Sequence, residues 1–147
     1  MERYRKLSDM LTVAQDREKL YWEELERRLG WLPDCLMRYL GLDATEIVES
    51  ELGPEQRVRL ELDVRREAYA SCALSVNIDD QSGATHTFEL NLLFTYVDGR
   101  FILRERESEF LVDLRLDDNP DLFWSDACDE VYASLQRRIK NNTLPAI

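Results

Sequence analysis

Two acidic residues near the middle of the chain fall where a β-strand pattern calls for apolar side chains. Phe101 and Leu103 point to one face of the pattern, which then places Glu105 on that face and Glu107 at the turn beyond it. A buried carboxylate must find a hydrogen-bond partner or take up a proton. Glu105 could therefore orient a ligand or transfer protons inside a concave sheet. We favour the alternative, that it is solvent-exposed at the end of the sheet or re-aimed by a β-bulge.

His86 is the one histidine of the chain and falls on the same nominal face as Glu105. A metal site needs converging ligands, and no HxH, HxxxH or CxxC spacing occurs in the sequence. The sequence also lacks a GxSxG motif and a phosphate-cradling glycine loop. We therefore predict no metal, no cofactor and no catalytic residue. If a pocket exists, Glu105 and His86 are its candidate polar groups.

An acidic segment near the end of the chain is the strongest candidate for partner binding. Residues 113–130 hold many carboxylates against a single basic residue, Arg115. Acids in the first turn of a helix are also simply good helix chemistry, since they complement the helix dipole. The alternative is a dock for a basic partner, with an aromatic anchor. The candidate residues are Asp117, Asp118, Asp121, Trp124, Asp126, Asp129 and Glu130.

Composition limits the classes of partner. The chain has 147 residues and a formal net charge of −11 at pH 7, so nucleic acid and anionic membrane surfaces are disfavoured. Cys35, Cys72 and Cys128 lack metal-ligand spacing and are typical of free thiols in a reducing compartment. We see no signal-peptide pattern and no apolar run near the ~20 residues of a membrane helix. We expect a cytoplasmic protein.

Apolar residues at helical spacing predict a long first helix over residues 3–29, closed by Gly30 as a C-terminal cap. Glu18 interrupts its apolar stripe. Heptad-like spacing is compatible with a coiled-coil partner, but we favour packing of the stripe on the protein's own sheet. The stripe consists of Tyr4, Leu7, Leu11, Ala14, Tyr21 and Leu25.

Further helices are predicted on both sides of the sheet region. Pro33 opens a short helix that Gly41 ends. A third short helix is expected over residues 44–52, with a strand there as the alternative. Asn119 and Pro120 then start a final helix that runs to about residue 140, with Asn as N-cap and Pro at the first helical position.

Between residues 56 and 117, apolar and polar residues alternate with a period of two, which indicates strands with one solvent-exposed face. Asp98-Gly99 predicts a tight type I′ hairpin turn. Turns are also predicted at 65–67 and at Glu107-Ser108, with a five-residue loop over 80–84. Because a slip of one residue would turn every side chain over, these turns fix the core-facing neighbours. The expected neighbours are Tyr96 and Phe101, Phe94 and Leu103, Leu103 and Val112, Phe101 and Leu114, Leu74 and Leu90, Ala70 and Phe94, and Leu62 and Ala70.

The predicted fold class is α+β, in one domain over residues 1–147. A five-stranded antiparallel meander in the order 1-2-3-4-5 carries the helices on one face. Residues 1–55 form the helical N-terminal part, 56–117 the sheet, 119–140 the C-terminal helix and 141–147 a tail. On the outer face, Leu93, Ile102 and Leu111 break the polar alternation and could form a homodimer or partner contact.

These features favour a non-enzymatic interaction module, such as an adaptor, a dedicated chaperone or an inhibitor of a basic partner. In size, acidity and mix of helices with a sheet, the chain resembles the dedicated chaperones of bacterial secretion systems. Those have a helix between their third and fourth strands, whereas Asp98-Gly99 joins these strands directly. The alternative is a ligand-binding domain. Small residues at Ala68, Ala70 and Cys72 leave room at mid-sheet under the C-terminal helix, in a layout that resembles helix-grip folds.

Overall fold

A five-stranded antiparallel sheet forms the centre of the protein. The computed structural model describes residues 1–42 and 57–141, apart from the side chains of Val64 and Arg66. The strands lie in the order β1-β2-β3-β4-β5, so the predicted meander is confirmed. The strands are β1 (Val58–Arg66), β2 (Tyr69–Asp79), β3 (Thr85–Val97), β4 (Arg100–Glu105) and β5 (Leu111–Leu114).

Tight turns set the register of the last strands as the sequence predicts. Asp98 and Gly99 have φ angles of 51° and 77°, and positive φ at both central residues is the mark of a type I′ turn. Tyr96 consequently pairs with Phe101. The remaining expected neighbours of β2 to β5 are also paired, which keeps one continuous apolar face across these four strands.

The first hairpin differs from the prediction. Leu62 pairs with Cys72 rather than with Ala70, and Ala70 instead pairs with Arg65. A β-bulge between Leu62 and Val64 shifts the register, and the chain turns later than expected, at Glu67, whose φ is 51°. A positive φ is uncommon for a glutamate, so the turn predicted at 65–67 was placed slightly too early. The shift leaves Leu62 43% exposed.

Within residues 1–42 and 57–141, the helices that accompany the sheet are α1 (Glu2–Leu29), α2 (Leu32–Leu40) and α4 (Pro120–Asn141). Gly41 ends α2 with a φ of 75°, the left-handed conformation that glycine adopts without strain. Gly30 is the C-cap of α1, as predicted, and keeps right-handed dihedrals with φ −61° and ψ −22°. The backbone N–H groups of Asp121 and Leu122 donate to the Asn119 side chain, which confirms the predicted N-cap of α4. The predicted element over 44–52 lies outside the described residues.

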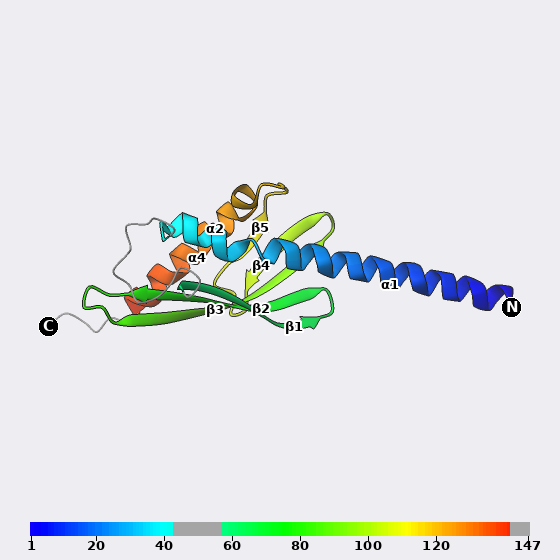
Figure 1. The fold of residues 1–147 in the computed structure, drawn as a ribbon, viewed down its shortest axis with the longest axis horizontal. Coiled ribbons are helices and arrows are strands. Elements are labelled where there is room, and N and C mark those ends of the chain that lie inside the picture. Colours follow the sequence, from blue (N-terminus) through cyan, green and yellow to red (C-terminus); the bar gives the residue numbers. More distant parts are fainter. Residues whose placement is uncertain (43–56, 142–147) are drawn as a thin grey trace.

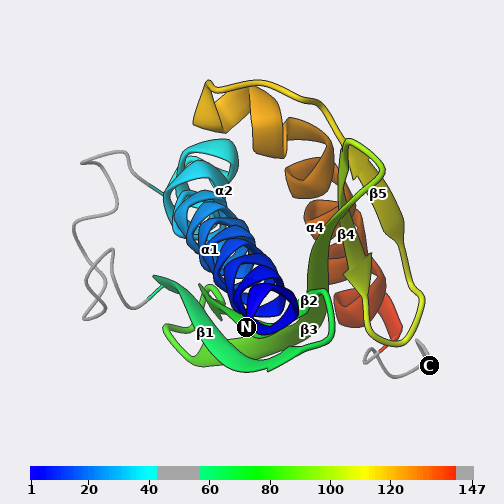
Figure 2. The ribbon, with the colours of Figure 1, turned by 90° about the vertical axis from the view of Figure 1, so that its right-hand side faces the viewer.

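The sheet curls, and the helices lie on its concave side (Figure 2). The view along α1 shows β1 to β3 on one side of that helix, with β4 and β5 rising beside α4. The core between the layers contains Phe94, Phe123 and Trp124, whose side chains are fully buried. Ala70 lies opposite Phe94, so a small side chain on one strand makes room for a large one on the next.

The N-terminal part of α1 extends beyond the sheet (Figure 1). Residues 1–20 are all exposed, whereas Trp22, Leu25 and Leu29 are buried. Our expectation that the whole apolar stripe packs on the protein's own sheet is therefore wrong. The sheet covers only the end of the stripe that is near the core, because the sheet stops where the helix continues.

Candidate functional site

Glu105 is a buried carboxylate that closes a turn. Its side chain is 1% exposed, and it pairs with Leu92 in the register that the sequence predicts. One carboxylate oxygen, Oε2, accepts the backbone N–H groups of Glu107 at 2.9 Å and Glu109 at 3.0 Å. Both alternatives that we favoured, an exposed strand end and a bulge, are wrong. Charge-assisted hydrogen bonds from the turn backbone offset the burial of the carboxylate.

A polar hollow of about 450 Å³ opens beside this turn. Arg138 of α4 donates to the carbonyl oxygen of Glu89 at 2.7 Å and to the carboxylate of Glu109 at 3.4 Å. Ser134 hydrogen-bonds the same Glu109 carboxylate. These contacts tie α4 to the turn that Glu105 organises. Among the residues described, no group of three His, Cys, Asp or Glu side chains is placed to hold a metal ion.

His86 lies at a different hollow, of about 350 Å³, which is lined also by Ile78, Asp80, Phe88 and Ile139. Its Nε2 is 2.8 Å from Asp80 Oδ2. Hydrogen bonds from Ser82, and then from His86, lower the pKa of Asp80. Asp80 thus organises the 80–84 loop, and His86 supports it. Phe88 lines both hollows, but the structure does not bring His86 and Glu105 together in one site.

Trp124, the expected anchor of the acidic segment, is a core residue. Its side chain is fully buried, and its Nε1 donates to the carbonyl oxygen of Arg28 at 2.8 Å. A tryptophan held in this way cannot insert into a partner. The helical period turns Trp124 inward while it turns Asp126 outward, so residues that are neighbours in sequence separate in space.

Three carboxylates of the acidic segment are engaged within the protein. Arg28 contacts Asp118 at 3.3 Å and Arg38 contacts Asp121 at 2.8 Å, while the hydroxyl of Tyr39 donates to Asp129 at 2.7 Å. These contacts join α4 and the residues just before it to α1 and α2. The guanidinium of Arg38 lowers the pKa of Asp121, and the hydrogen bond to Asp129 raises the pKa of Tyr39 to about 12.

The remaining candidates of the acidic segment are Asp117, Asp126 and Glu130. Asp117 uses its backbone oxygen to accept from Arg28 at 3.0 Å and its carboxylate to accept from the backbone of Asn119 at 2.8 Å. Asp126 is exposed and Glu130 is half-buried. Asp117 thus makes contacts within the protein, whereas no contact is described for the carboxylates of Asp126 and Glu130.

Arg28 was not among the predicted site residues, yet it organises the junction of three elements. Its side chain is 5% exposed and bonds Glu24 at 2.7 Å. Its guanidinium also lies 4.5 Å from the centroid of the Phe101 ring and 4.6 Å from that of Phe123. A cation between aromatic faces is stabilised when desolvated. The signal in the sequence is its position, since the helical period places Arg28 on the buried side of its helix.

The remaining candidates do not form a larger site. Leu93 and Leu111 both pair with Arg104, which therefore lies between them on the outer face. Ala70 and Cys72 are buried opposite Phe94 and Leu92. Ala68 lies in the exposed turn before β2 rather than at mid-sheet, as we had expected.

An open apolar feature lies on α1. We call Tyr4, Leu7, Leu11 and Ala14 the exposed stripe. Tyr4 is 73% exposed, Leu7 64% and Leu11 59%. Their spacing continues the face that carries Tyr21 and Leu25 into the core. Among the described residues, no other element covers this apolar face, although a polar surface helix needs no such face.

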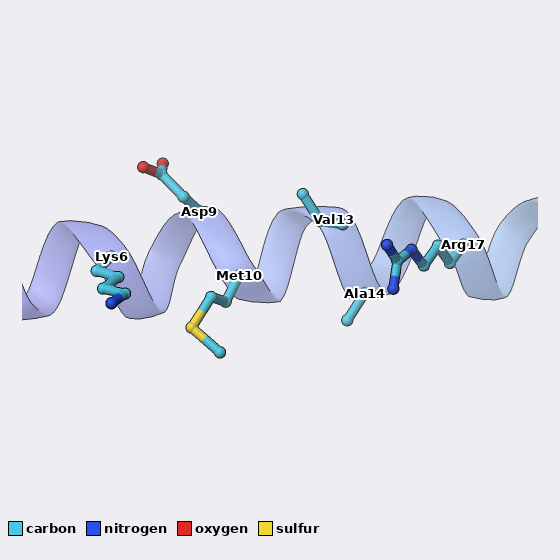
Figure 3. A pocket seen from close by; sticks show the side chains of 6 residues that line it. All are labelled: Lys6, Asp9, Met10, Val13, Ala14 and Arg17. Carbon is cyan, nitrogen blue, oxygen red and sulfur yellow. The ribbon is translucent and has the colours of Figure 1, made fainter.

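In this part of α1, neighbouring side chains point to different sides of the helix (Figure 3). Met10 and Ala14 point to one side of the helix, and Asp9 and Val13 point to the other. The six labelled residues line a shallow groove along the helix. Val13 is 50% exposed, which makes it an apolar residue of the same segment that lies off the exposed stripe.

Within the described residues, no helix combines the length and the apolarity that a membrane crossing requires. Comparisons with protein-family models, with curated proteins and with solved structures find no match to this chain.

Proposed function

We propose that this protein is a non-enzymatic interaction module that binds another protein chain through the exposed stripe of α1. The observation that carries the proposal is the exposure of residues 1–20, with Tyr4, Leu7, Leu11 and Ala14 on one face. An amphipathic helix that lays its apolar face against a partner is a common mode of protein recognition. The acidic segment, by contrast, uses several of its carboxylates in contacts with α1 and α2.

The general stability of helices supports a partner that covers the exposed part of α1. Most of the stability of a helix in a protein comes from packing of its apolar face, and isolated helices are marginal in water. The segment 1–20 extends roughly 30 Å, given the helical rise per residue. Of the described ion pairs, only that of Lys19 with Glu23, at 3.9 Å, involves a residue of this segment. A partner that covers the exposed stripe supplies the missing packing.

The chemistry of the other candidate residues supports a non-enzymatic role. The Glu105 carboxylate is occupied by the turn backbone, and His86 holds the 80–84 loop through Asp80. Burial raises the pKa of the thiols of Cys35, Cys72 and Cys128 to about 12. At neutral pH these cysteines are protonated and poor nucleophiles.

Site-specific photo-cross-linking tests the proposal. A photoreactive phenylalanine analogue is placed at Leu11 in one variant and at Val13 in another, and both are irradiated in cells that produce the protein. We expect a protein adduct from position 11 and much less from position 13, because only Leu11 lies on the exposed stripe. Equal labelling from both positions, or none from either, would contradict binding through this face.

A second candidate function is binding of a small apolar ligand in the hollow at His86. Ile78, Phe88 and Ile139 give this hollow an apolar lining, and it lies between the sheet and the end of α4. A fluorescent apolar dye tests this: its binding should be lost in Ile139→Asp and retained in the control Leu111→Asp, on the outer sheet face. Dye binding that is unchanged by Ile139→Asp would remove the candidate.

A further inference from the structure

Along the exposed stripe, the sizes and charges of the side chains are complementary to those of a second copy of the helix that runs in the opposite direction. Along α1 (Glu2–Leu29), Tyr4 and Leu7 lie near the N-terminal tip, and Leu11 and Ala14 lie closer to the rest of the protein. When two such helices run antiparallel, Tyr4 of one copy can face Ala14 of the other while Leu7 faces Leu11. A large side chain then lies opposite a small one at each end of the seam, with leucines between them, as close packing requires.

Glu18 distinguishes a parallel from an antiparallel pair of helices. It lies on the same helical face as the exposed stripe, four residues after Ala14. In a parallel pair Glu18 would face its own copy in the seam, and like charges there are destabilising. In the antiparallel register that pairs Leu7 with Leu11, Glu18 lies beside the first residues of the partner helix. Arg3 is there, so an acidic side chain meets a basic one.

The distribution of charge along the first 26 residues also favours an antiparallel pair. Residues 2–6 contain three basic side chains and one acidic, whereas residues 16–26 contain five acidic and two basic. In the register that pairs Leu7 with Leu11, residues 2–6 of one helix face residues 12–16 of the other, so each basic tip ends beside Asp16 and Glu18, the first acids of the partner's base. A parallel pair sets basic against basic and acidic against acidic. Charge complementarity thus favours the antiparallel arrangement.

The globular body also restricts the arrangement. From Tyr21 onward the seam-forming face of α1 lies against the protein's own sheet, where Leu25 is 1% exposed. A parallel partner would bring its body to the same level of the helix. In an antiparallel pair the bodies lie at opposite ends (Figure 1 shows the length of helix between the body and the tip).

From these observations we infer that the partner that covers the exposed stripe is a second copy of this chain, in an antiparallel helix pair related by a two-fold axis near Asp9. This inference rests on the proposed function and names its partner. Each residue of a two-fold interface acts twice. The seam spans about two heptads, a small interface, so we expect a dissociation constant on the order of 10 µM.

Sedimentation velocity over a range of about 2–200 µM tests the association. Wild type should pass from monomer to dimer, and Leu11→Glu should raise the dissociation constant by at least ~100-fold. Val13→Glu adds the same charge to the same helix off the stripe, and should change the dissociation constant less than ~3-fold. Unchanged thermal unfolding at low concentration shows that both variants are folded.

Disulfide trapping tests the orientation. The native cysteines are buried, so wild type in a glutathione redox buffer is the background. A mixture of Leu7→Cys and Leu11→Cys chains should form mixed dimers well in excess of the self-linked dimers of either variant alone. An excess of self-linked dimers would overturn the antiparallel register and indicate a parallel pair.

The two proposals can fail separately. Wild type that stays monomeric throughout the concentration range overturns the second copy as partner. If photo-cross-linking at Leu11 then still captures a different protein, binding through the exposed stripe stands. If it captures nothing, both proposals are wrong.

Discussion

The two ends of α1 present the same helical face to different surroundings. From Trp22 to Leu29 this face is buried in the core, and from Tyr4 to Ala14 it is exposed. The apolar spacing alone does not separate the two parts. The difference teaches that periodicity identifies the face of a helix that is to be covered, while the length of the sheet decides how much of it the same chain can cover.

The first prediction compares one leucine from each end. Leu25→Ala should lower the free energy of unfolding by about 3 kcal/mol, because it removes packing atoms and leaves a cavity in the core. Leu11→Ala should change it by no more than about 0.5 kcal/mol at low protein concentration, since the side chain is exposed. Urea unfolding of both variants provides the measurement. Similar losses would mean that the tip of α1 folds back onto the body.

The second prediction concerns the buried base of α1. Arg28→Met should cost about 2 kcal/mol, because it removes hydrogen bonds to Glu24 and Asp117 and the contacts with two aromatic rings. Arg27→Met is the matched control. Arg27 bonds the same Glu24 but is 53% exposed, and exposed ion pairs contribute about 0–1 kcal/mol. If thermal denaturation finds equal costs, burial of Arg28 is not what makes it important.

The sequence predicts contacts between residues that are close in sequence better than contacts between distant ones. Hairpin turns fix register over short distances in sequence, so Asp98-Gly99 was enough to place Tyr96 beside Phe101. The turn predicted at 65–67 was placed slightly too early, because the chain turns at Glu67 and Ala68 with a backbone conformation that is unusual for glutamate. The partners of Asp118 and Asp121 were missed because Arg28 and Arg38 are far away in sequence, and composition of one segment says nothing about what another segment brings to it.

Glu105 shows what a broken pattern can mean. The sequence located the acid on the core face correctly, and the register of β4 followed from the turns. The wrong step was to treat the carboxylate as a side chain to be exposed or re-aimed. Backbone N–H groups in a turn are acceptable partners for a buried carboxylate, but their direction depends on the path of residues 106–109, which alternation does not encode.

The third prediction tests this turn against its exposed neighbour. Glu105→Gln keeps an acceptor oxygen but loses the charge, so we expect a cost of about 1 kcal/mol from weaker hydrogen bonds to Glu107 and Glu109. Glu107→Gln, in the same turn but exposed, should cost less than about 0.5 kcal/mol. Chemical denaturation measures both. A Glu105→Gln variant as stable as wild type would show that the charge does not hold the turn.

The smallest expected effect concerns the contact of α2 with α4. Arg38 lowers the pKa of Asp121 below its ordinary value, so the folded state binds the proton less readily than the unfolded chain. The contribution of Asp121 is therefore present above its ordinary pKa of about 3.8 and is lost as the pH falls through the lower folded value. Both side chains are about half exposed, and we expect Asp121→Asn to cost about 0.5 kcal/mol at pH 7.

That cost should shrink as the solution is acidified below about pH 4, because wild type then loses the same charge. Thermal unfolding of wild type and Asp121→Asn at matched pH values measures the convergence. Asp126→Asn, on an exposed residue of the same helix, is the control and should follow wild type throughout. A deficit in Asp121→Asn that persists undiminished at pH 2 would mean that the shape of the side chain, and not its charge toward Arg38, holds α2 against α4.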